Sequence, residues 1–299
     1  MLKEIAIITI TMANLNGVDV AYRDYLGYQL VERAPVSAEL AALWSAPAMA
    51  GQSSMLLQPA DGASVYLRLV EDEPIPGYAP MTSWGWNATE ILVADPDGLA
   101  ESMANSPFEI IGPPKDLWTA PEAPRAFQVL GPGNEVLYLT SNPPMERVHG
   151  LTPDYGVERV FIMIVGGPSM EALRTFYADT LGAPSEPATS WQISVIANAN
   201  GLPAETTFGL TVAAIAPGYL IELDEYPPSM GMRPSKADHL PPGVAAVGFT
   251  TEGLDSAKLD WRSAPRPMAE FPYGGRKVGV TVGPAGEWIE LIETPAEND

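Results

Sequence analysis

The sequence contains no cysteine and only two histidines, His149 and His239, among its 299 residues. Without thiols the chain has no disulfide, iron–sulfur cluster, thiolate nucleophile or cysteine-based zinc site. Two histidines are also too few for a three-histidine zinc site. Basic residues are scarce, because 16 Lys and Arg stand against 37 Asp and Glu, and the formal net charge is −21. This balance disfavours nucleic acids and anionic membrane surfaces as partners.

Long apolar runs are missing as well. The run over residues 5–10 is too short to span a membrane, and no small-residue cleavage site follows it. We therefore expect a cytoplasmic protein without a membrane partner. The composition, 46% hydrophobic and 18% charged, is typical of a globular protein, and the length suffices for two domains.

Two motifs occur twice with nearly the same separation. Residues 21–27 (AYRDYLG) are similar to residues 176–182 (FYADTLG), 155 positions later. Residues 131–139 (GPGNEVLYL) are similar to residues 283–291 (GPAGEWIEL), 152 positions later. Two separate matches at almost the same offset indicate that the second half of the chain repeats the first.

The two halves meet in a stretch rich in proline and glycine. We predict one domain over residues 1–145, a linker over 146–156 that contains His149, and a second domain over 157–299. Within each half a strand, a helix and three strands follow one another twice, as judged from alternation, helical spacing and turn residues. The four resulting modules cover about residues 4–72, 84–142, 157–226 and 243–294.

This βαβββ order predicts an α+β fold. A single module leaves one face of its sheet bare, so two modules are needed to close a cupped sheet. We expect the two modules of each domain to pair, which gives two cupped eight-stranded mixed sheets with the helices outside. The hollow of a cup is the natural place for a pocket.

The repeated segments also resemble a known family. Asn14-Leu15 followed by residues 22–27, the equivalent segment 176–182 and the segment 283–291 resemble signatures of the vicinal oxygen chelate superfamily. That superfamily contains glyoxalase I, bleomycin-resistance proteins and extradiol ring-cleavage dioxygenases. The resemblance covers nearly the whole chain, and it indicates the fold more than any one reaction.

The resemblance places metal ligands early in the first strand and in the last strand of each module. The first-strand positions carry Ile7, Ala88, Ile162 and Ala245, none of which binds a metal. The last-strand positions carry Arg68, Tyr138, Glu222 and Glu290. The two histidines that an extradiol dioxygenase needs are therefore missing. We expect no cofactor, and a divalent metal held by Glu290 and Glu222 is the less favoured alternative.

In the first half, strand alternation directs Tyr66, Arg68, Glu90 and Tyr138 into the predicted cup. One interpretation is an anion-binding arginine held by Glu90, with the tyrosine hydroxyls orienting a ligand. The other is a structural Arg–Glu pair inside a filled cup.

In the second half, Glu222 and Glu290 come from equivalent strands, and Trp288 shares a face with Glu290. Two carboxyl groups that approach each other across a cup would form an acid–base pair, because one pKa must rise. The alternative is that Arg276 or Lys277 caps them and that they serve structure.

Further candidates lie near the predicted openings of the cups. His239 lies in a loop before the fourth module, either directed into the cup as a ligand or base, or solvated. The segment around it, residues 226–243, is longer than a usual connection and is predicted to act as a lid. Aromatic residues suited to a flat apolar ligand are Trp84, Trp86, Trp191, Tyr226 and Tyr273.

Two functions follow from these residues. The first is metal-free binding of a small apolar or aromatic molecule in the sheet cavity. The second is a lyase or isomerase that uses Glu222 and Glu290, with a ring-cleaving dioxygenase less favoured. In either case the partner is a small molecule, and the chain is a monomer or a homodimer.

Overall fold

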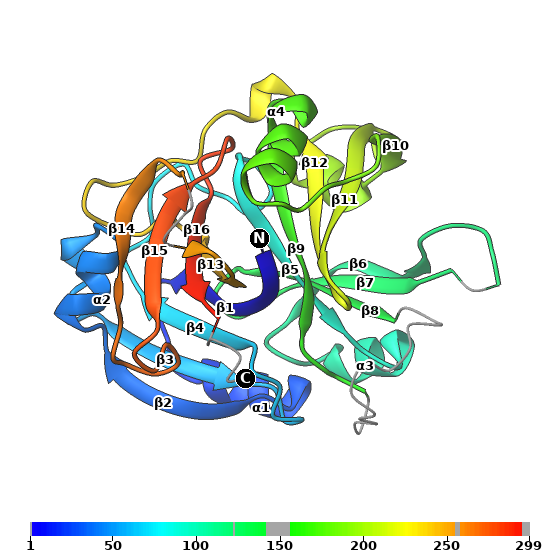
Figure 1. Cartoon of the computed structure of the whole chain (residues 1–299). Helices are drawn as coiled ribbons and strands as arrows, with labels where there is room; N and C mark the ends of the chain where they lie inside the picture. Colours follow the sequence, from blue (N-terminus) through cyan, green and yellow to red (C-terminus); the bar gives the residue numbers. More distant parts are fainter. Residues whose placement is uncertain (1, 122, 142–155, 255–257, 295–299) are drawn as a thin grey trace.

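The computed structural model describes residues 2–121, 123–141, 156–254 and 258–294. The predicted linker lies outside these residues except for Gly156, and so does His149. The described strands form two eight-stranded mixed sheets, called sheet A and sheet B here, which lie side by side (Figure 1). This confirms the predicted α+β architecture of paired modules.

Sheet A has the strand order β14-β15-β16-β13-β1-β4-β3-β2. Its strands are β1 (Leu2–Met12), β2 (Gln29–Pro35), β3 (Ser53–Gln58), β4 (Tyr66–Glu71), β13 (Gly243–Thr251), β14 (Trp261–Pro267), β15 (Lys277–Val282) and β16 (Trp288–Glu293). Sheet B has the order β10-β11-β12-β9-β5-β8-β7-β6. Its strands are β5 (Gly85–Leu92), β6 (Glu109–Asp116), β7 (Arg125–Leu130), β8 (Val136–Ser141), β9 (Val160–Gly167), β10 (Thr189–Gln192), β11 (Thr207–Ala216) and β12 (Tyr219–Glu225).

The pairing of the modules differs from the prediction. The first module shares sheet A with the fourth, and the second shares sheet B with the third, so residues 1–145 and 157–299 do not form separate domains. The central strands pair antiparallel, β1 with β13 and β5 with β9. An internal repeat identifies equivalent modules but not partners, because the first strand of each module is similarly apolar.

The described helices are α1 (Val18–Leu26), α2 (Ala38–Leu43), α3 (Pro96–Met103), α4 (Met170–Thr175) and α5 (Ser194–Ala199), with the short helices η1 (Pro47–Met49), η2 (Phe176–Thr180) and η3 (Pro228–Met230). In the fourth module, the described residues between β13 and β14 form no named helix, and residues 255–257 of this connection lie outside the described structure. No helix in the described part of the chain has the length and apolar character needed to cross a membrane.

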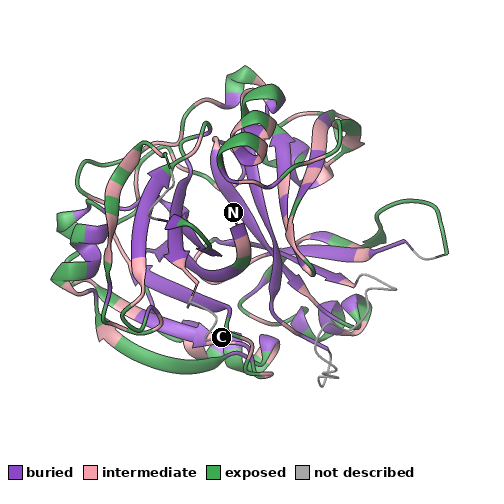
Figure 2. Ribbon diagram, in the orientation of Figure 1, coloured by how far each residue is buried: buried purple, intermediate pink, exposed green. Residues whose placement is uncertain are grey.

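Strand β1 shows why the sheets are buried on both faces. Ile8 and Ile10 belong to a core that joins sheet A to sheet B, whereas Ile7 faces the interior of the sheet A cup. Residues one apart on a strand point to opposite faces, so both faces of β1 are covered. Figure 2 shows this as buried central strands and an exposed edge strand β2.

The repeated motifs form equivalent contacts between the sheets. The hydroxyl of Tyr22 donates to Glu135 over 2.7 Å, and the hydroxyl of Tyr177 donates to Glu287 over 3.1 Å. In each contact the tyrosine follows the first strand of one module and the glutamate lies in the last hairpin of the next module. Because the first and second modules, like the third and fourth, belong to different sheets, each contact ties sheet A to sheet B.

Candidate functional site

The cup of sheet A is filled by a tryptophan. Ser37 caps the N-terminus of helix α2, because its hydroxyl accepts from the backbone N–H of Leu40, and Trp44 follows the last turn. Trp44 is fully buried, and its Nε1 donates to Glu290 Oε1 over 2.7 Å. The hydroxyl of Tyr273 donates to the other carboxyl oxygen of Glu290, also over 2.7 Å. Glu290 is 0% exposed, and its carboxyl is enclosed by these donors.

The other predicted residues of this cup join the same packing. Arg68 donates to the Tyr273 hydroxyl over 2.8 Å and lies over the rings of Trp44 and Tyr273. Tyr66 packs edge-on against Phe271, and Trp288 lies under the guanidinium of Arg262. A groove of about 70 Å³ remains beside Arg68.

The predicted partners of these residues lie elsewhere. Arg68 does not meet Glu90, and Glu222 does not approach Glu290, because the members of each pair belong to different sheets. The capping of Glu290 by Arg276 or Lys277 is also wrong, since Trp44 and Tyr273 are its donors. Strand alternation correctly predicted which face each of these side chains occupies, but it did not identify the module on the opposite side of the cup.

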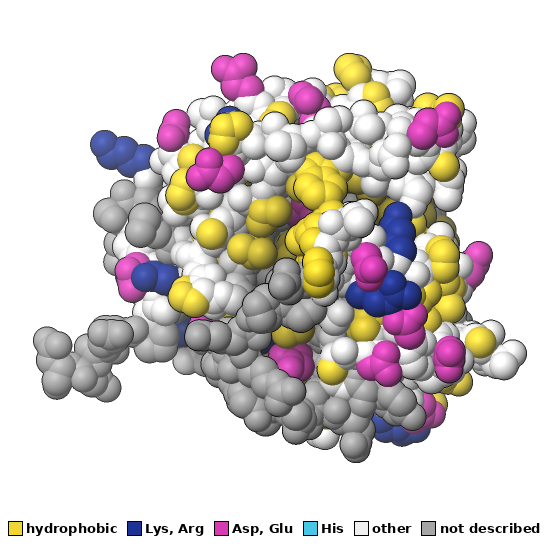
Figure 3. All heavy atoms as spheres, turned by 90° about the vertical axis from the view of Figure 1, so that its right-hand side faces the viewer, with side chains coloured by type: hydrophobic (Ala, Val, Ile, Leu, Met, Phe, Trp, Pro, Cys, Tyr) yellow, Lys and Arg dark blue, Asp and Glu magenta, His cyan; other side chains and the backbone are white. Residues whose placement is uncertain are grey.

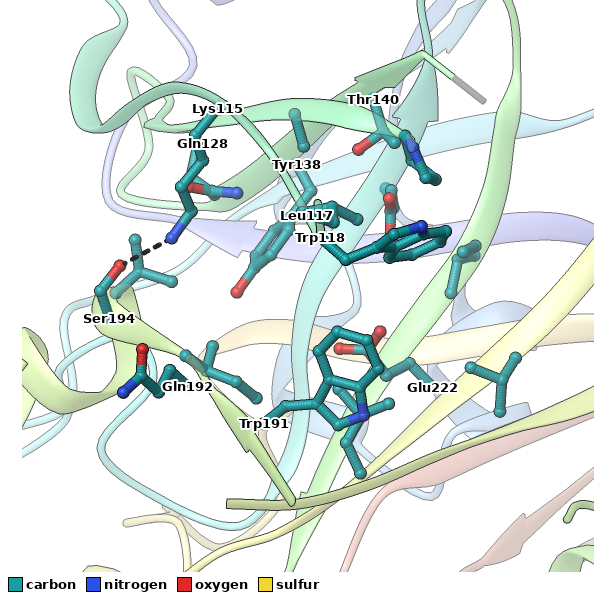
Figure 4. A pocket seen from close by; sticks show the side chains of 18 of the residues that line it. Lys115, Leu117, Trp118, Gln128, Tyr138, Thr140, Trp191, Gln192, Ser194 and Glu222 are labelled. Atoms are coloured by element: carbon teal, nitrogen blue, oxygen red, sulfur yellow. Dashed lines mark hydrogen bonds between the residues drawn. The ribbon is translucent and has the colours of Figure 1, made fainter. Parts of the chain in front are cut away.

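The cup of sheet B encloses a cavity of about 290 Å³. Three of the predicted residues, Glu90, Tyr138 and Glu222, line it together. Figure 3 shows hydrophobic side chains gathered in the middle of the face seen from the sheet B side. Other lining residues, several of them drawn in Figure 4, are Lys115, Leu117, Trp118, Gln128, Thr140, Phe161, Ile162, Trp191, Gln192, Ser194, Val195, Leu210 and Val212.

A difference between two short helices explains why this cup stays open. Helices α2 and α5 are both six residues long and both lie between the second and third strands of their modules. Trp44 follows α2, whereas Asn200 follows α5. The side chain of Asn200 donates to the backbone oxygens of Met81 and Ile196 instead of reaching into the cup. The residue that follows α5 therefore supplies no indole to the cup of sheet B.

Carboxyl groups are the main polar feature of the sheet B cup. Glu90 on β5 is 4% exposed and lies opposite Tyr138 on β8. On β12, Glu222 is half-buried, and Asp224, which shares its face, is fully buried. Burial raises the pKa of Glu90 to about 7 and that of Asp224 to about 8. Burial, together with Asp224 and Glu90, also raises the pKa of Glu222 well above its usual range.

These three carboxyl groups lack a cationic partner. In the described part of the chain, no salt bridge involves Glu90, Glu222 or Asp224. Both carboxyl oxygens of Asp224 are also without a hydrogen-bond partner there. Lys115 lines the cavity, but it is exposed, and its Nζ donates to the Ser194 hydroxyl over 3.2 Å (Figure 4).

Two tryptophans contribute to the wall of the cavity. Trp191 on β10, predicted near an opening, lines the cavity, and its ring lies 6.1 Å from that of Trp118, edge to face. Trp118 lies in the hairpin between β6 and β7 and is 46% exposed. Sequence analysis missed Trp118, although an exposed Leu-Trp pair in a hairpin loop is a usable signal.

Residues 226–243 do not cover this cavity. Tyr226 and Met230 pack into the interior of sheet B, and Arg233 donates to the backbone oxygens of Trp86 and Val244. His239 does not line the sheet B cavity. Its side chain is largely buried, its Nδ1 lies 3.0 Å from both carboxyl oxygens of Asp72, and it borders a separate pocket of about 470 Å³ together with Trp288 of sheet A.

The donor sets of the two cups do not fit a metal ion. In sheet B the positions that the resemblance predicts as metal ligands carry Ala88, Ile162, Tyr138 and Glu222, which offer one carboxylate. In sheet A the carboxyl of Glu290 is occupied by two donors. Among the described residues, no three His, Asp or Glu side chains are arranged to hold a metal ion.

Comparison with known proteins establishes the fold. No family model matches the sequence, and no curated protein matches it either. Glyoxalase I from Zea mays aligns over 97% of this chain and 92% of its own, with a TM-score of 0.63 and 14% identity. A Bacillus subtilis protein with a provisional dioxygenase assignment aligns over 98% and 86%, with a TM-score of 0.58 and 12% identity. The chain therefore has the vicinal oxygen chelate fold, as the repeated motifs predict.

Proposed function

We propose that the protein binds a small, mainly apolar or aromatic molecule in the cavity of sheet B, without a metal ion. The observation that carries the proposal is the contrast between the cups, since an indole fills one and about 290 Å³ is open in the other. Ligand pockets are mostly apolar with a few polar groups that orient the ligand. Phe161, Val195 and Leu210 supply such a wall, and Gln128 and Tyr138 supply polar groups.

The proposal is tested with N-phenyl-1-naphthylamine, a neutral probe whose fluorescence rises in apolar surroundings. We expect saturable binding of one probe per chain, because one cup is filled. Trp191→Ala removes part of the wall and should weaken binding about fivefold, which corresponds to about 1 kcal/mol. The matched control is Phe271→Ala, an aromatic residue 48% exposed beside Tyr66 of sheet A, which should leave binding unchanged.

An equal loss in both variants, or no saturable binding, would contradict the proposal. The proposal that the protein contains no metal ion is tested separately, by measuring the metal content of protein purified without chelator. We expect far less than one transition metal per chain, and one tightly bound ion per chain would overturn this part.

A lyase or isomerase is the second candidate, with Glu222 and Glu90 in place of the pair first predicted. It is favoured by two carboxyl groups with raised pKa values facing one cavity, an arrangement suited to moving a proton next to a carbonyl. Incubation of 2-tetralone, a two-ring ketone, in D₂O tests it by mass spectrometry. Hydrogen–deuterium exchange of the ketone that is faster than in buffer alone, and that is lost in Glu222→Gln, would support this function. Exchange at the rate seen in buffer alone would exclude it for this ketone.

A further inference from the structure

We propose that the molecule bound in the sheet B cavity is an organic cation, an ammonium group attached to an aromatic or other apolar body. This inference rests on the proposed function, because it specifies the charge of the ligand that the same cavity takes. Two independent observations carry it, namely carboxyl groups without countercharge in the cup and aromatic side chains around the same space.

The first observation concerns the carboxyl groups. Glu90 and Glu222 line the cavity, and the buried Asp224 follows on the same face of β12 with both oxygens unpartnered in the described structure. A buried carboxyl group without a countercharge is costly, whether it ionises or stays protonated. An ammonium group placed among them would supply the missing charge and hydrogen-bond donors. In sheet A the equivalent carboxyl group has hydrogen-bond donors within the protein, because Trp44 and Tyr273 donate to Glu290.

The second observation concerns the aromatic wall. Trp118, Trp191 and Tyr138 line the cavity together with Glu222, and Figure 4 shows these side chains around one space. The faces of indole and phenol rings attract cations, most strongly when both are shielded from water. The apolar side chains of Phe161 and the neighbouring strands favour an organic body over a hydrated inorganic ion.

The charge around the cavity favours the same ligand. Lys115, the cationic residue of the lining in the described chain, is exposed and bound to Ser194, so it does not neutralise the cup. The net charge of −21 attracts cations to the surface and disfavours anions. An anionic aromatic ligand would meet both this field and the carboxyl groups.

The ligand's charge also predicts a pH dependence. Glu90 on β5 is faced by Glu222 and Asp224 on β12, by Tyr138 on β8 and, at the rim, by Lys115 on β6. Glu90 and Asp224 lose protons between about pH 6 and 9, since burial raises the pKa of Glu90 to about 7 and that of Asp224 to about 8. A quaternary ammonium ligand, which has no proton of its own to lose, should therefore bind more tightly as the pH rises through this range.

The test is displacement of N-phenyl-1-naphthylamine at pH 7.5 by three compounds of similar shape. They are 2-naphthylmethylamine, which is cationic, 2-naphthylmethanol, which is neutral, and 2-naphthoate, which is anionic. We expect the amine to displace the probe at concentrations about tenfold lower than the alcohol, and the naphthoate to be the weakest. Equal displacement by amine and alcohol would overturn this inference and leave the proposed function standing, whereas failure of the probe itself to bind would overturn the proposed function.

Two isosteric variants test whether the preference for the amine depends on the carboxyl groups of the cavity. Glu90→Gln and Glu222→Gln keep the shape of the cavity and replace a carboxyl group that can ionise beside an ammonium group with a neutral amide, so each should weaken amine binding about tenfold and change alcohol binding less than twofold. The control, Glu205→Gln, makes the same change in net charge on an exposed loop. If Glu205→Gln weakens amine binding as much as Glu222→Gln does, the preference comes from the overall charge of the protein and the inference is wrong. Retained binding of the alcohol shows that each variant is folded.

Discussion

At the scale of single residues, Glu222 and Glu290 stand in the same Ile-Glu-Leu tripeptide of equivalent strands but have opposite surroundings. Glu290 accepts hydrogen bonds from Trp44 and Tyr273, whereas Glu222 faces a cavity and other carboxyl groups. The sequence could not separate them, because Trp44 lies 246 positions from Glu290. A local motif fixes the direction of a side chain, and its partners depend on the tertiary fold.

This assignment predicts that Tyr273→Phe affects stability and not binding. The variant removes a donor to Glu290 and an acceptor for Arg68, so the free energy of unfolding should fall by about 1–3 kcal/mol. Urea unfolding measures this loss, and binding of N-phenyl-1-naphthylamine should stay within twofold of the wild type.

The control for that variant is Tyr226→Phe. Tyr226 is also buried, but its hydroxyl has no hydrogen-bond partner in the described structure, so its removal should cost less than about 0.5 kcal/mol. If both substitutions lower the free energy of unfolding equally, the hydrogen bonds of the Tyr273 hydroxyl contribute nothing to stability.

At the scale of elements, the strands and the longer helices were predicted from the sequence, whereas the short helices α2 and α5 were not. Alternation and the helical spacing of Val18, Tyr22 and Leu26 locate β1 and α1, because burial of one face imposes those periods. Helices α2 and α5 have six residues each, too few for a clear period. Yet α2 leads directly to Trp44, which is buried in the cup of sheet A.

The role of α2 gives a prediction for Trp44→Ala. Removal of a fully buried indole should lower the free energy of unfolding by about 3–5 kcal/mol and leave a cavity in sheet A. If the variant remains folded, a second molecule of N-phenyl-1-naphthylamine should bind per chain, which titration at low temperature measures.

The matched control is Trp118→Ala, which removes an exposed indole and should cost less than about 1 kcal/mol. It should also weaken binding at the existing site without adding another. A Trp44→Ala protein that is folded and still binds one probe would show that other side chains close the space.

At the scale of the whole molecule, buried acids make stability depend on pH. Burial raises the pKa of Glu90, Glu135 and Glu287 to about 7 and that of Asp224 to about 8. The folded chain therefore holds protons that the unfolded chain releases, and this contribution to stability is lost as the pH rises through about 7 to 8. We expect a higher melting temperature at pH 5.5 than at pH 8.5.

Repulsion within a chain of net charge −21 would act in the same direction, but salt screens it. The melting temperatures should therefore be compared in 0.5 M NaCl, where the difference from the buried acids persists. A difference that disappears in salt would assign the effect to surface charge.

The pairing of the first module with the fourth has a consequence for the order of folding. Every strand of sheet B has been synthesised once Glu225 is added, whereas sheet A lacks half of its strands at that point and is complete only when β16 has been added. A domain can fold as a unit once all of its residues have been synthesised. On the ribosome, the sheet that holds the cavity can therefore close first, while the N-terminal module waits for a partner that is translated last.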